Sequence, residues 1–158
     1  MDEVEKTIGD ILRKKGMTLG VIESATGGLI SNRITNVAGS SDYYKGSITA
    51  YSNEIKNRIV GVKAETLDEY GSVSAQTAEE LASGGKNVLE VDICIADTGM
   101  AGPGGATPDK PVGLFYIGLS HKTTTFNRKH IFDGDREQNK EEAADTALQI
   151  LKEYLESL

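Results

Sequence analysis

The fold of this chain is indicated first by residues 18–30, which read TLGVIESATGGLI. The first half of the stretch is a short β-branched and apolar run, typical of a buried strand that ends at Glu23. Two glycines then open an apolar pattern at helical spacing, which continues to Ile34. A strand that turns directly into a helix is characteristic of α/β domains.

The same alternation continues along the chain. The expected strands are 18–23, 46–51, 92–97, 112–120 and 123–132, and the expected helices are 2–15, 29–34, 74–88, one from Ser52 and one that Asp135 caps with Gln138 in a capping box. Gly84 and Gly85 weaken the helix over 74–88, which indicates a kink or a close packing contact. The pattern predicts an α/β fold, specifically a three-layer α/β/α sandwich with a mostly parallel sheet and an antiparallel edge.

Length and composition favour one globular domain over residues 1–158, with 38% hydrophobic and 26% charged residues. A formal net charge of -7 repels a phosphate backbone, so nucleic acid is not an expected partner. The apolar runs are strand-length and the N-terminus is acidic, so we expect no membrane association, no signal peptide and a cytoplasmic location.

A single cysteine, Cys94, excludes an internal disulfide and a thiolate metal cluster. It lies in an apolar run, where a small buried hydrophobe is the ordinary interpretation. His, Cys and carboxylate residues show no metal-ligand spacing, so we predict neither a catalytic metal nor another cofactor.

Ligands of α/β proteins bind beyond the carboxyl ends of the strands, which directs attention to residues 23–28, ESATGG. The hydroxyl of Ser24 could attack a carbonyl carbon, and the glycines would let backbone N–H groups approach an oxyanion. Both histidines lie in the late strands, so a lysine with a lowered pKa would have to serve as the base. The alternative is that Ser24 or Thr26 only caps the following helix.

A second candidate segment, residues 51–56, joins the next strand to a helix. It places Tyr51, Asn53 and Lys56 near one rim, and Lys56 is the best candidate partner for Ser24. The alternative is a solvated surface lysine that pairs with Glu54 or Asn57.

Two further segments could contact a ligand. Residues 98–113 are rich in glycine, so a ligand could approach the backbone closely and Thr98 could donate a hydrogen bond, although a plain loop would have the same composition. This segment is neither a P-loop nor a dinucleotide fingerprint. Arg136 lies beside a helix N-terminus, which suits an anion, or it pairs with Asp133 or Glu137.

Taken together, these segments resemble the CinA C-terminal domain family. The motifs are Glu23-Ser24-x-Thr26-Gly27-Gly28, Gly39-Ser40-Ser41, Tyr51-Ser52-Asn53-Glu54-x-Lys56, Gly71-x-Val73-Ser74, Thr98-Gly99-x-Ala101-Gly102-Pro103-x-Gly105, Lys110-Pro111-Val112-Gly113 and Gly134-Asp135-Arg136. They occur in the family's order over nearly the whole chain. Members with known activity are nicotinamide-nucleotide amidases, which convert nicotinamide mononucleotide to nicotinate mononucleotide and ammonia.

The resemblance implies that Ser24 is the nucleophile, Lys56 its base and Tyr51 an assisting or orienting hydroxyl. It also implies a small-molecule nucleotide as substrate and a homo-oligomer as the working state. On this basis backbone N–H groups of residues 26–28 would stabilise the oxyanion. The implied substrate-binding residues are Thr26, Gly27, Gly28, Asn53, Thr98, Gly99, Gly102, Gly105 and Arg136.

Two positions depart from the family pattern. Ala25 stands where cysteine is common, which excludes a thiolate mechanism at that position. Asp97 stands where an uncharged residue is usual, and its negative charge would weaken binding of a phosphate nearby. These departures leave two alternatives open, namely a noncatalytic pyridine-nucleotide-binding regulatory module and an amidase that acts on a related nucleotide.

Overall fold

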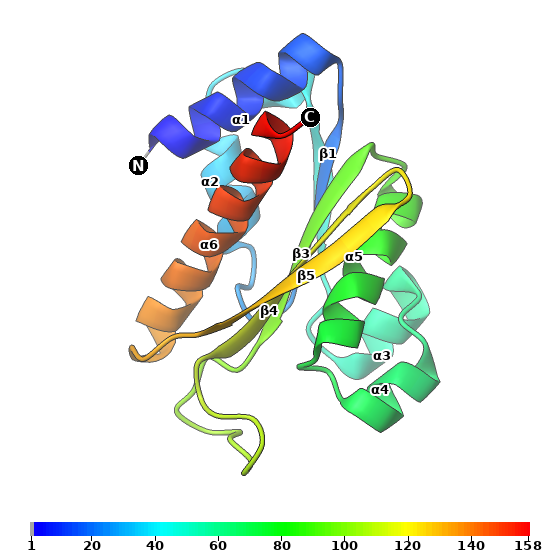
Figure 1. Ribbon diagram of the computed structural model, residues 1–158, viewed down its shortest axis with the longest axis vertical. Helices are drawn as coiled ribbons and strands as arrows, with labels where there is room; N and C mark the ends of the chain where they lie inside the picture. Colours follow the sequence, from blue (N-terminus) through cyan, green and yellow to red (C-terminus); the bar gives the residue numbers. More distant parts are fainter. Residues whose placement is uncertain (1) are drawn as a thin grey trace.

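A computed structural model describes residues 2–158 as one five-stranded sheet covered by helices on both faces (Figure 1). The strands are β1 Leu19–Glu23, β2 Tyr44–Thr49, β3 Ile93–Gly99, β4 Leu114–His121 and β5 Thr124–Ile131. The helices are α1 Asp2–Lys15, α2 Leu29–Thr35, α3 Asn53–Ile55, α4 Ala64–Tyr70, α5 Ala75–Leu89 and α6 Arg136–Glu156, with a 3₁₀ turn η1 Ser40–Asp42 and a π-helical segment η2 Lys56–Val60.

The strand order is β2-β1-β3-β4-β5. Strands β2, β1 and β3 run parallel, whereas β4 runs antiparallel to both β3 and β5. No helix lies between β3 and β4 or between β4 and β5, and a connection without a crossover returns the chain in the opposite direction. The α/β prediction is confirmed, and the antiparallel part of the sheet comprises β4 as well as the edge strand β5.

The helices form the two outer layers of the expected sandwich. Helices α1, α2 and α6 lie on one face of the sheet and α3, α4 and α5 on the other (Figure 1). The predicted apolar stripe of α6 is buried against the first face, from Ala143 to Leu155, and the predicted capping box at Asp135 is present. None of the helices described between residues 2 and 158 combines the length and the apolar character needed to cross a bilayer.

Helix α5 packs closely against the sheet at Gly85 and against η2 at Gly84. A Cβ atom at Gly85 would lie 2.3 Å from Cγ1 of Ile22, and one at Gly84 would lie 2.2 Å from the carbonyl oxygen of Val60. Helix α5 continues through both positions, so the glycines serve close packing. Cys94 lies in the same core, and burial raises the pKa of its thiol to about 12, which confirms a small buried hydrophobe.

Candidate active site

A cavity of about 230 Å³ lies where β1 and β3 end, at the carboxyl edge of the parallel strands. The loop before α5 and the first residue of α6 close its other sides. Its lining residues are Ser24, Ala25, Tyr51, Lys56, Ser72, Val73, Thr98, Gly99, Met100, Ala101, Gly102, Gly104 and Arg136. This is the edge at which the sequence places a ligand.

Ser24 and Lys56 are in direct contact in this cavity. Ser24 directly follows β1, and Lys56 lies in the segment that follows β2. Nζ of Lys56 is 2.9 Å from Oγ of Ser24. Lys56 is 1% exposed. The expected Ser24–Lys56 contact is therefore present, and the alternative of a solvated surface lysine is wrong.

Burial of the Lys56 amine brings its pKa closer to neutral pH. Its Nζ also lies 2.9 Å from the carbonyl oxygen of Ala50 and 2.7 Å from that of Tyr51. Burial lowers the pKa of Lys56 to about 8, although the charge of Asp97 opposes this shift. Carbonyl oxygens only accept hydrogen bonds, so a neutral amine would use both of its N–H groups on them and direct its lone pair at the Ser24 hydroxyl.

Glu23 holds the turn between β1 and α2. Its carboxylate is fully buried and accepts hydrogen bonds at 2.6–3.0 Å. The donors are the Thr26 hydroxyl, the backbone N–H groups of Gly28, Ile30 and Ser31, and the Ser31 hydroxyl. The N-cap of α2 is Gly28, without a side-chain cap, so the alternative that Ser24 or Thr26 only caps this helix is wrong.

The expected oxyanion role of residues 26–28 requires correction. The N–H of Thr26 is bonded to Asp97, that of Gly27 to the Ser24 carbonyl and that of Gly28 to Glu23. These hydrogen bonds occupy all three N–H groups, and none of the three residues lines the cavity.

Ala25 offers a free donor in their place. Within the described chain its N–H makes no hydrogen bond, and Ala25 lines the cavity. The N–H directly after a serine nucleophile is the usual oxyanion donor of strand–turn–helix hydrolases.

Asp97 lies behind Ser24 and does not line the cavity. It is fully buried and accepts hydrogen bonds from the Ser24 N–H at 2.9 Å and from the Thr26 hydroxyl at 2.6 Å. Burial raises the pKa of its carboxyl group above the usual value, although the hydrogen bonds from Thr26 and Ser24 lower it. The expectation that Asp97 places a charge beside a bound phosphate is therefore corrected, because its carboxyl group is enclosed by the β1–α2 turn.

Arg136 and Tyr51 meet at the mouth of the cavity. The Arg136 guanidinium donates to the carbonyl oxygen of Gly102 at 2.7 Å and to the hydroxyl of Tyr51 at 3.3 Å. No ion pair of Arg136 with Asp133 or Glu137 is found among residues 2–158. The remaining guanidinium N–H groups are available to an anion.

The other expected ligand-binding residues fall into two groups. Thr98, Gly99 and Gly102 line the cavity, although Thr98 donates its hydroxyl proton to the carbonyl of Ser72 at 2.5 Å and can only accept from a ligand. Asn53, at the start of α3, and Gly105, in the loop between β3 and β4, lie outside the lining.

Sequence reasoning missed Ser72, Val73 and Met100 as lining residues. The motif Gly71-x-Val73-Ser74 was a signal for the first two. Only the packing of α5 beside β3 shows that this motif reaches the cavity.

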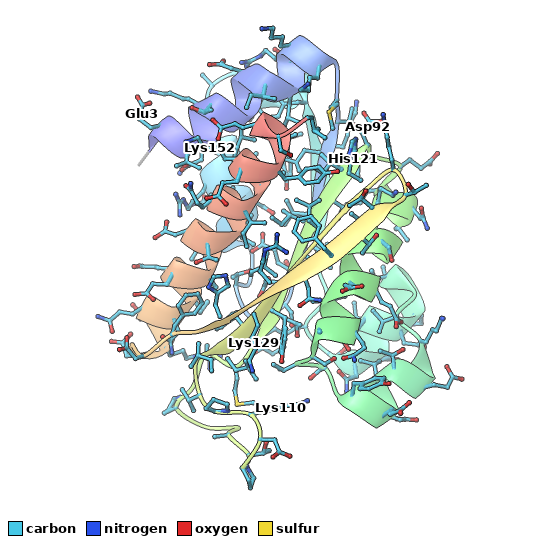
Figure 2. The ribbon with its side chains drawn as sticks, in the orientation of Figure 1. Glu3, Asp92, Lys110, His121, Lys129 and Lys152 are labelled. Atoms are coloured by element: carbon cyan, nitrogen blue, oxygen red, sulfur yellow. The ribbon has the colours of Figure 1, made fainter. Side chains whose placement is uncertain are left out.

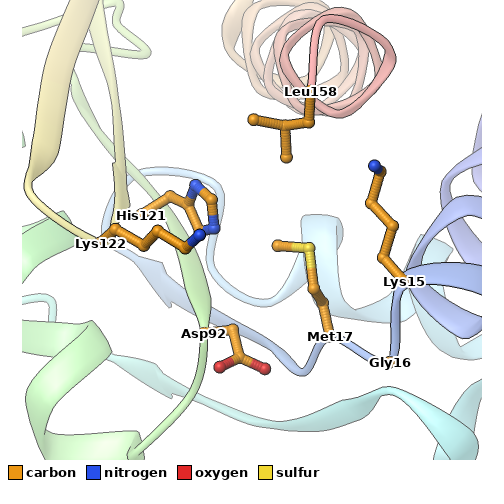
Figure 3. A pocket seen from close by; sticks show the side chains of 7 residues that line it. All are labelled: Lys15, Gly16, Met17, Asp92, His121, Lys122 and Leu158. Atoms are coloured by element: carbon orange, nitrogen blue, oxygen red, sulfur yellow. The ribbon is translucent and has the colours of Figure 1, made fainter.

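A larger cavity of about 590 Å³ lies at the opposite end of the sheet, between Asp92 and the C-terminal Leu158 (Figure 3). Figure 2 shows the separation, with Asp92 and His121 at the upper end and Lys110 of the glycine-rich loop at the lower end. His121 is bonded to the Tyr154 hydroxyl at 2.8 Å, and no serine, threonine or cysteine lines this cavity. The contact between Ser24 and Lys56 is found at the smaller cavity.

Comparison with known proteins assigns residues 1–155 to the family model described as CinA C-terminal domain. A CinA-like protein of Thermotoga neapolitana is 43% identical over 157 residues, which are 98% of this chain and 38% of that protein. A putative competence-damage inducible protein of Halothermothrix orenii is 46% identical over 94% of this chain and 36% of its own length. The chain thus spans somewhat over a third of these curated relatives.

Solved structures agree over the whole chain. The competence damage-inducible protein A of Klebsiella pneumoniae superposes with a TM-score of 0.94 at 30% identity and covers 98% of this chain and 96% of its own. The competence/damage inducible protein CihA of Agrobacterium tumefaciens gives a TM-score of 0.91 at 33% identity, with 95% and 92% covered.

Proposed function

The chain belongs to the CinA C-terminal domain family, and we propose that it hydrolyses the carboxamide of nicotinamide mononucleotide to nicotinate mononucleotide and ammonia. The observation that carries the proposal is the 2.9 Å contact between the Ser24 hydroxyl and the buried Lys56 amine. A serine with a buried lysine as its base is suited to acyl transfer, because the lysine can exchange a proton with the serine near neutral pH.

In the first half of the proposed reaction, Ser24 Oγ attacks the carboxamide carbon and gives its proton to neutral Lys56. The N–H of Ala25 donates to the oxygen that becomes negative in the tetrahedral intermediate. The C–N bond then breaks, Lys56 returns the proton to the departing nitrogen, and ammonia leaves an acyl ester on Ser24. One proton thus moves from the hydroxyl to the leaving group.

In the second half, Lys56 takes a proton from a water molecule, whose oxygen attacks the ester carbon. The ester bond breaks, Ser24 Oγ recovers a proton from Lys56, and nicotinate mononucleotide forms as the acid, which gives its remaining proton to solvent water and leaves as the carboxylate.

Recognition of the nucleotide is assigned to the mouth of the cavity. Arg136 is the cation there, and a guanidinium fork suits a phosphate. The glycines at 99, 102 and 104 leave the backbone open to close approach by a ribose. The 230 Å³ cavity is small for a ligand site, so we propose that it encloses the nicotinamide end and that the phosphate lies outside it, toward Arg136.

The decisive experiment incubates the purified chain with nicotinamide mononucleotide and measures ammonia, with Ser24→Ala beside the unchanged protein. Ser24→Ala is expected to lower the rate about a thousandfold or more while the circular dichroism spectrum is retained. Ser47→Ala on the exposed side of β2 is the matched control, with an unchanged rate.

Two results would redirect the proposal. Binding of nicotinamide mononucleotide without ammonia release would favour the noncatalytic regulatory module, and release only from another carboxamide in a substrate panel would favour an amidase for a related nucleotide. A cytoplasmic homo-oligomer stays a prediction of the resemblance, to be checked by light scattering of the purified chain and by cell fractionation.

A further inference from the structure

Two buried carboxyl groups, those of Glu23 and Asp97, lie behind Ser24 and both contact the hydroxyl of Thr26. Oγ1 of Thr26 lies 2.6 Å from Oε1 of Glu23 and 2.6 Å from Oδ1 of Asp97. All three side chains are almost completely buried. Both distances are typical of a charge-assisted hydrogen bond between two oxygen atoms.

The number of available protons determines which group donates in each of these two contacts. The Thr26 hydroxyl has one proton and can donate it to one carboxyl group only. If both acids were ionised, the other contact would press two oxygen lone pairs together at 2.6 Å without a proton between them. The geometry therefore requires a second proton, held by Glu23 or by Asp97 and donated to Thr26 Oγ1.

The other hydrogen bonds assign this second proton to Asp97. Glu23 accepts from three backbone N–H groups and the Ser31 hydroxyl besides Thr26, a set of donors that stabilises an ionised carboxylate. Asp97 accepts only the Ser24 N–H at 2.9 Å and the Thr26 N–H at 3.3 Å. The less well solvated acid keeps the proton.

Charge balance leads to the same assignment. The charged groups that face Asp97 are Glu23 from β1 and Lys56 from η2, while Lys140 of α6 comes near the same turn over Gly27. Ionised Glu23 and protonated Lys56 balance each other as buried charges, and Lys140 is only partly buried, so an ionised Asp97 would add a second buried negative charge. Burial and the charge of Glu23 raise the pKa of Asp97, and this rise outweighs the lowering by the hydrogen bonds from Thr26 and Ser24.

We propose that Asp97 is a positioning residue that stays protonated while Lys56 titrates, donating a hydrogen bond to Thr26 Oγ1 and holding the Ser24 backbone without a negative charge. The consequence falls on Lys56. An ionised Asp97 raises the pKa of Lys56, so a neutral Asp97 keeps the free amine accessible at lower pH. Only this consequence for turnover rests on the proposed amidase activity.

The first test is infrared spectroscopy of the unchanged chain at pH 7 and pH 8. A protonated carboxyl group absorbs at higher frequency than a carboxylate, and ¹³C in aspartate or in glutamate shifts the band of that acid alone. We expect one protonated-acid band that moves with labelled aspartate. Absence of the band at either pH, or movement with labelled glutamate, would overturn the proposal.

The second test compares Lys56 in Asp97→Asn and in the unchanged chain by NMR titration of the lysine side chain. Asparagine has the same shape as the protonated acid and is uncharged, so the substitution removes a negative charge only if Asp97 carries one. We expect the Lys56 midpoint to stay within about 0.3 pH unit, a twofold change in proton affinity. A larger fall would show that the substitution removed a negative charge, which would overturn the proposal.

Both readouts work without turnover, so they stand even if the chain releases no ammonia. The infrared test needs no variant, so it can still refute the proposal if Asp97→Asn fails to fold. If ammonia is released, Asp97→Asn should keep the rate at pH 7 within about threefold. Asp97→Ala should lower kcat by a larger factor than it changes KM, because it removes the group that positions the nucleophile.

Discussion

Nζ of Lys56 lies 2.9 Å from Oγ of Ser24, although 32 residues separate them along the chain. The contact exists because β1 and β2 are parallel neighbours, so that the turn after each strand opens at the same edge of the sheet. The two carbonyl partners of the Lys56 amine orient it relative to Ser24. Burial lowers the pKa of the amine to a value suited to proton transfer.

The pH dependence of turnover should report Lys56. Because burial lowers its pKa to about 8, the free amine is scarce in acid, and kcat/KM is expected to rise about tenfold per pH unit below pH 8 and to level off above it. The rate of ammonia release from pH 5.5 to 9.5 measures this. Lys56→Met should remove this dependence of the rate on pH, while Lys63→Met, at an exposed position, should retain it. A flat profile in the unchanged chain would exclude Lys56 as the base.

Arg136 should matter for the phosphate of the substrate. Loss of a charged hydrogen-bond donor in Arg136→Gln is expected to raise KM for nicotinamide mononucleotide about ten- to hundredfold. Nicotinamide riboside, which lacks the phosphate, should show no comparable change with the same variant. Arg128→Gln, at an exposed arginine of β5, is the control variant. Equal losses with both substrates would mean that Arg136 acts through Tyr51 or Gly102 instead.

Glu23 should stabilise the fold through its five donors. Glu23→Gln replaces one accepting oxygen by an NH₂ group and leaves part of the donor set without an acceptor, so the free energy of unfolding is expected to fall by about 2–5 kcal/mol. Urea unfolding monitored by circular dichroism gives the value. Glu65→Gln, on the exposed side of α4, should change it by less than about 0.5 kcal/mol. A similarly small effect at Glu23 would contradict a buried ionised carboxylate.

Asp97 should make stability depend on pH in one direction. Its pKa is raised above the usual value of 3.8 in the folded chain, so above that value the folded state keeps a proton that the unfolded state has lost. Stability is therefore full below about pH 4 and falls by about 1.4 kcal/mol per unit as pH rises, until the folded chain also loses the proton.

Asp97→Asn lacks this loss. Its free energy of unfolding, minus that of the unchanged chain, is expected to increase by about 3 kcal/mol from pH 4 to 6. Urea unfolding at several pH values measures the difference, and Asp68→Asn, at an exposed position of α4, should give a curve parallel to that of the unchanged chain. Parallel curves for Asp97→Asn as well would show that the carboxyl group is not perturbed.

Local sequence determined the elements of this protein and the candidates for its chemistry. The run ending at Glu23, the glycines that follow and the capping box at Asp135 are local signals, because strands, turns and caps depend on residues a few positions apart. The motifs, taken in order, also indicated the family that residues 1–155 match.

Tertiary structure decided which of these residues meet and in which state. Residues 26–28 carry the expected glycines, yet their N–H groups face Glu23 and Asp97, and Ala25 supplies the free donor. Asp97 was expected near a phosphate and lies instead behind Ser24, where it shares the Thr26 hydroxyl with Glu23. Burial, proton sharing and the direction of an N–H depend on groups that come from different strands, so they are defined only once β1, β2 and β3 lie side by side.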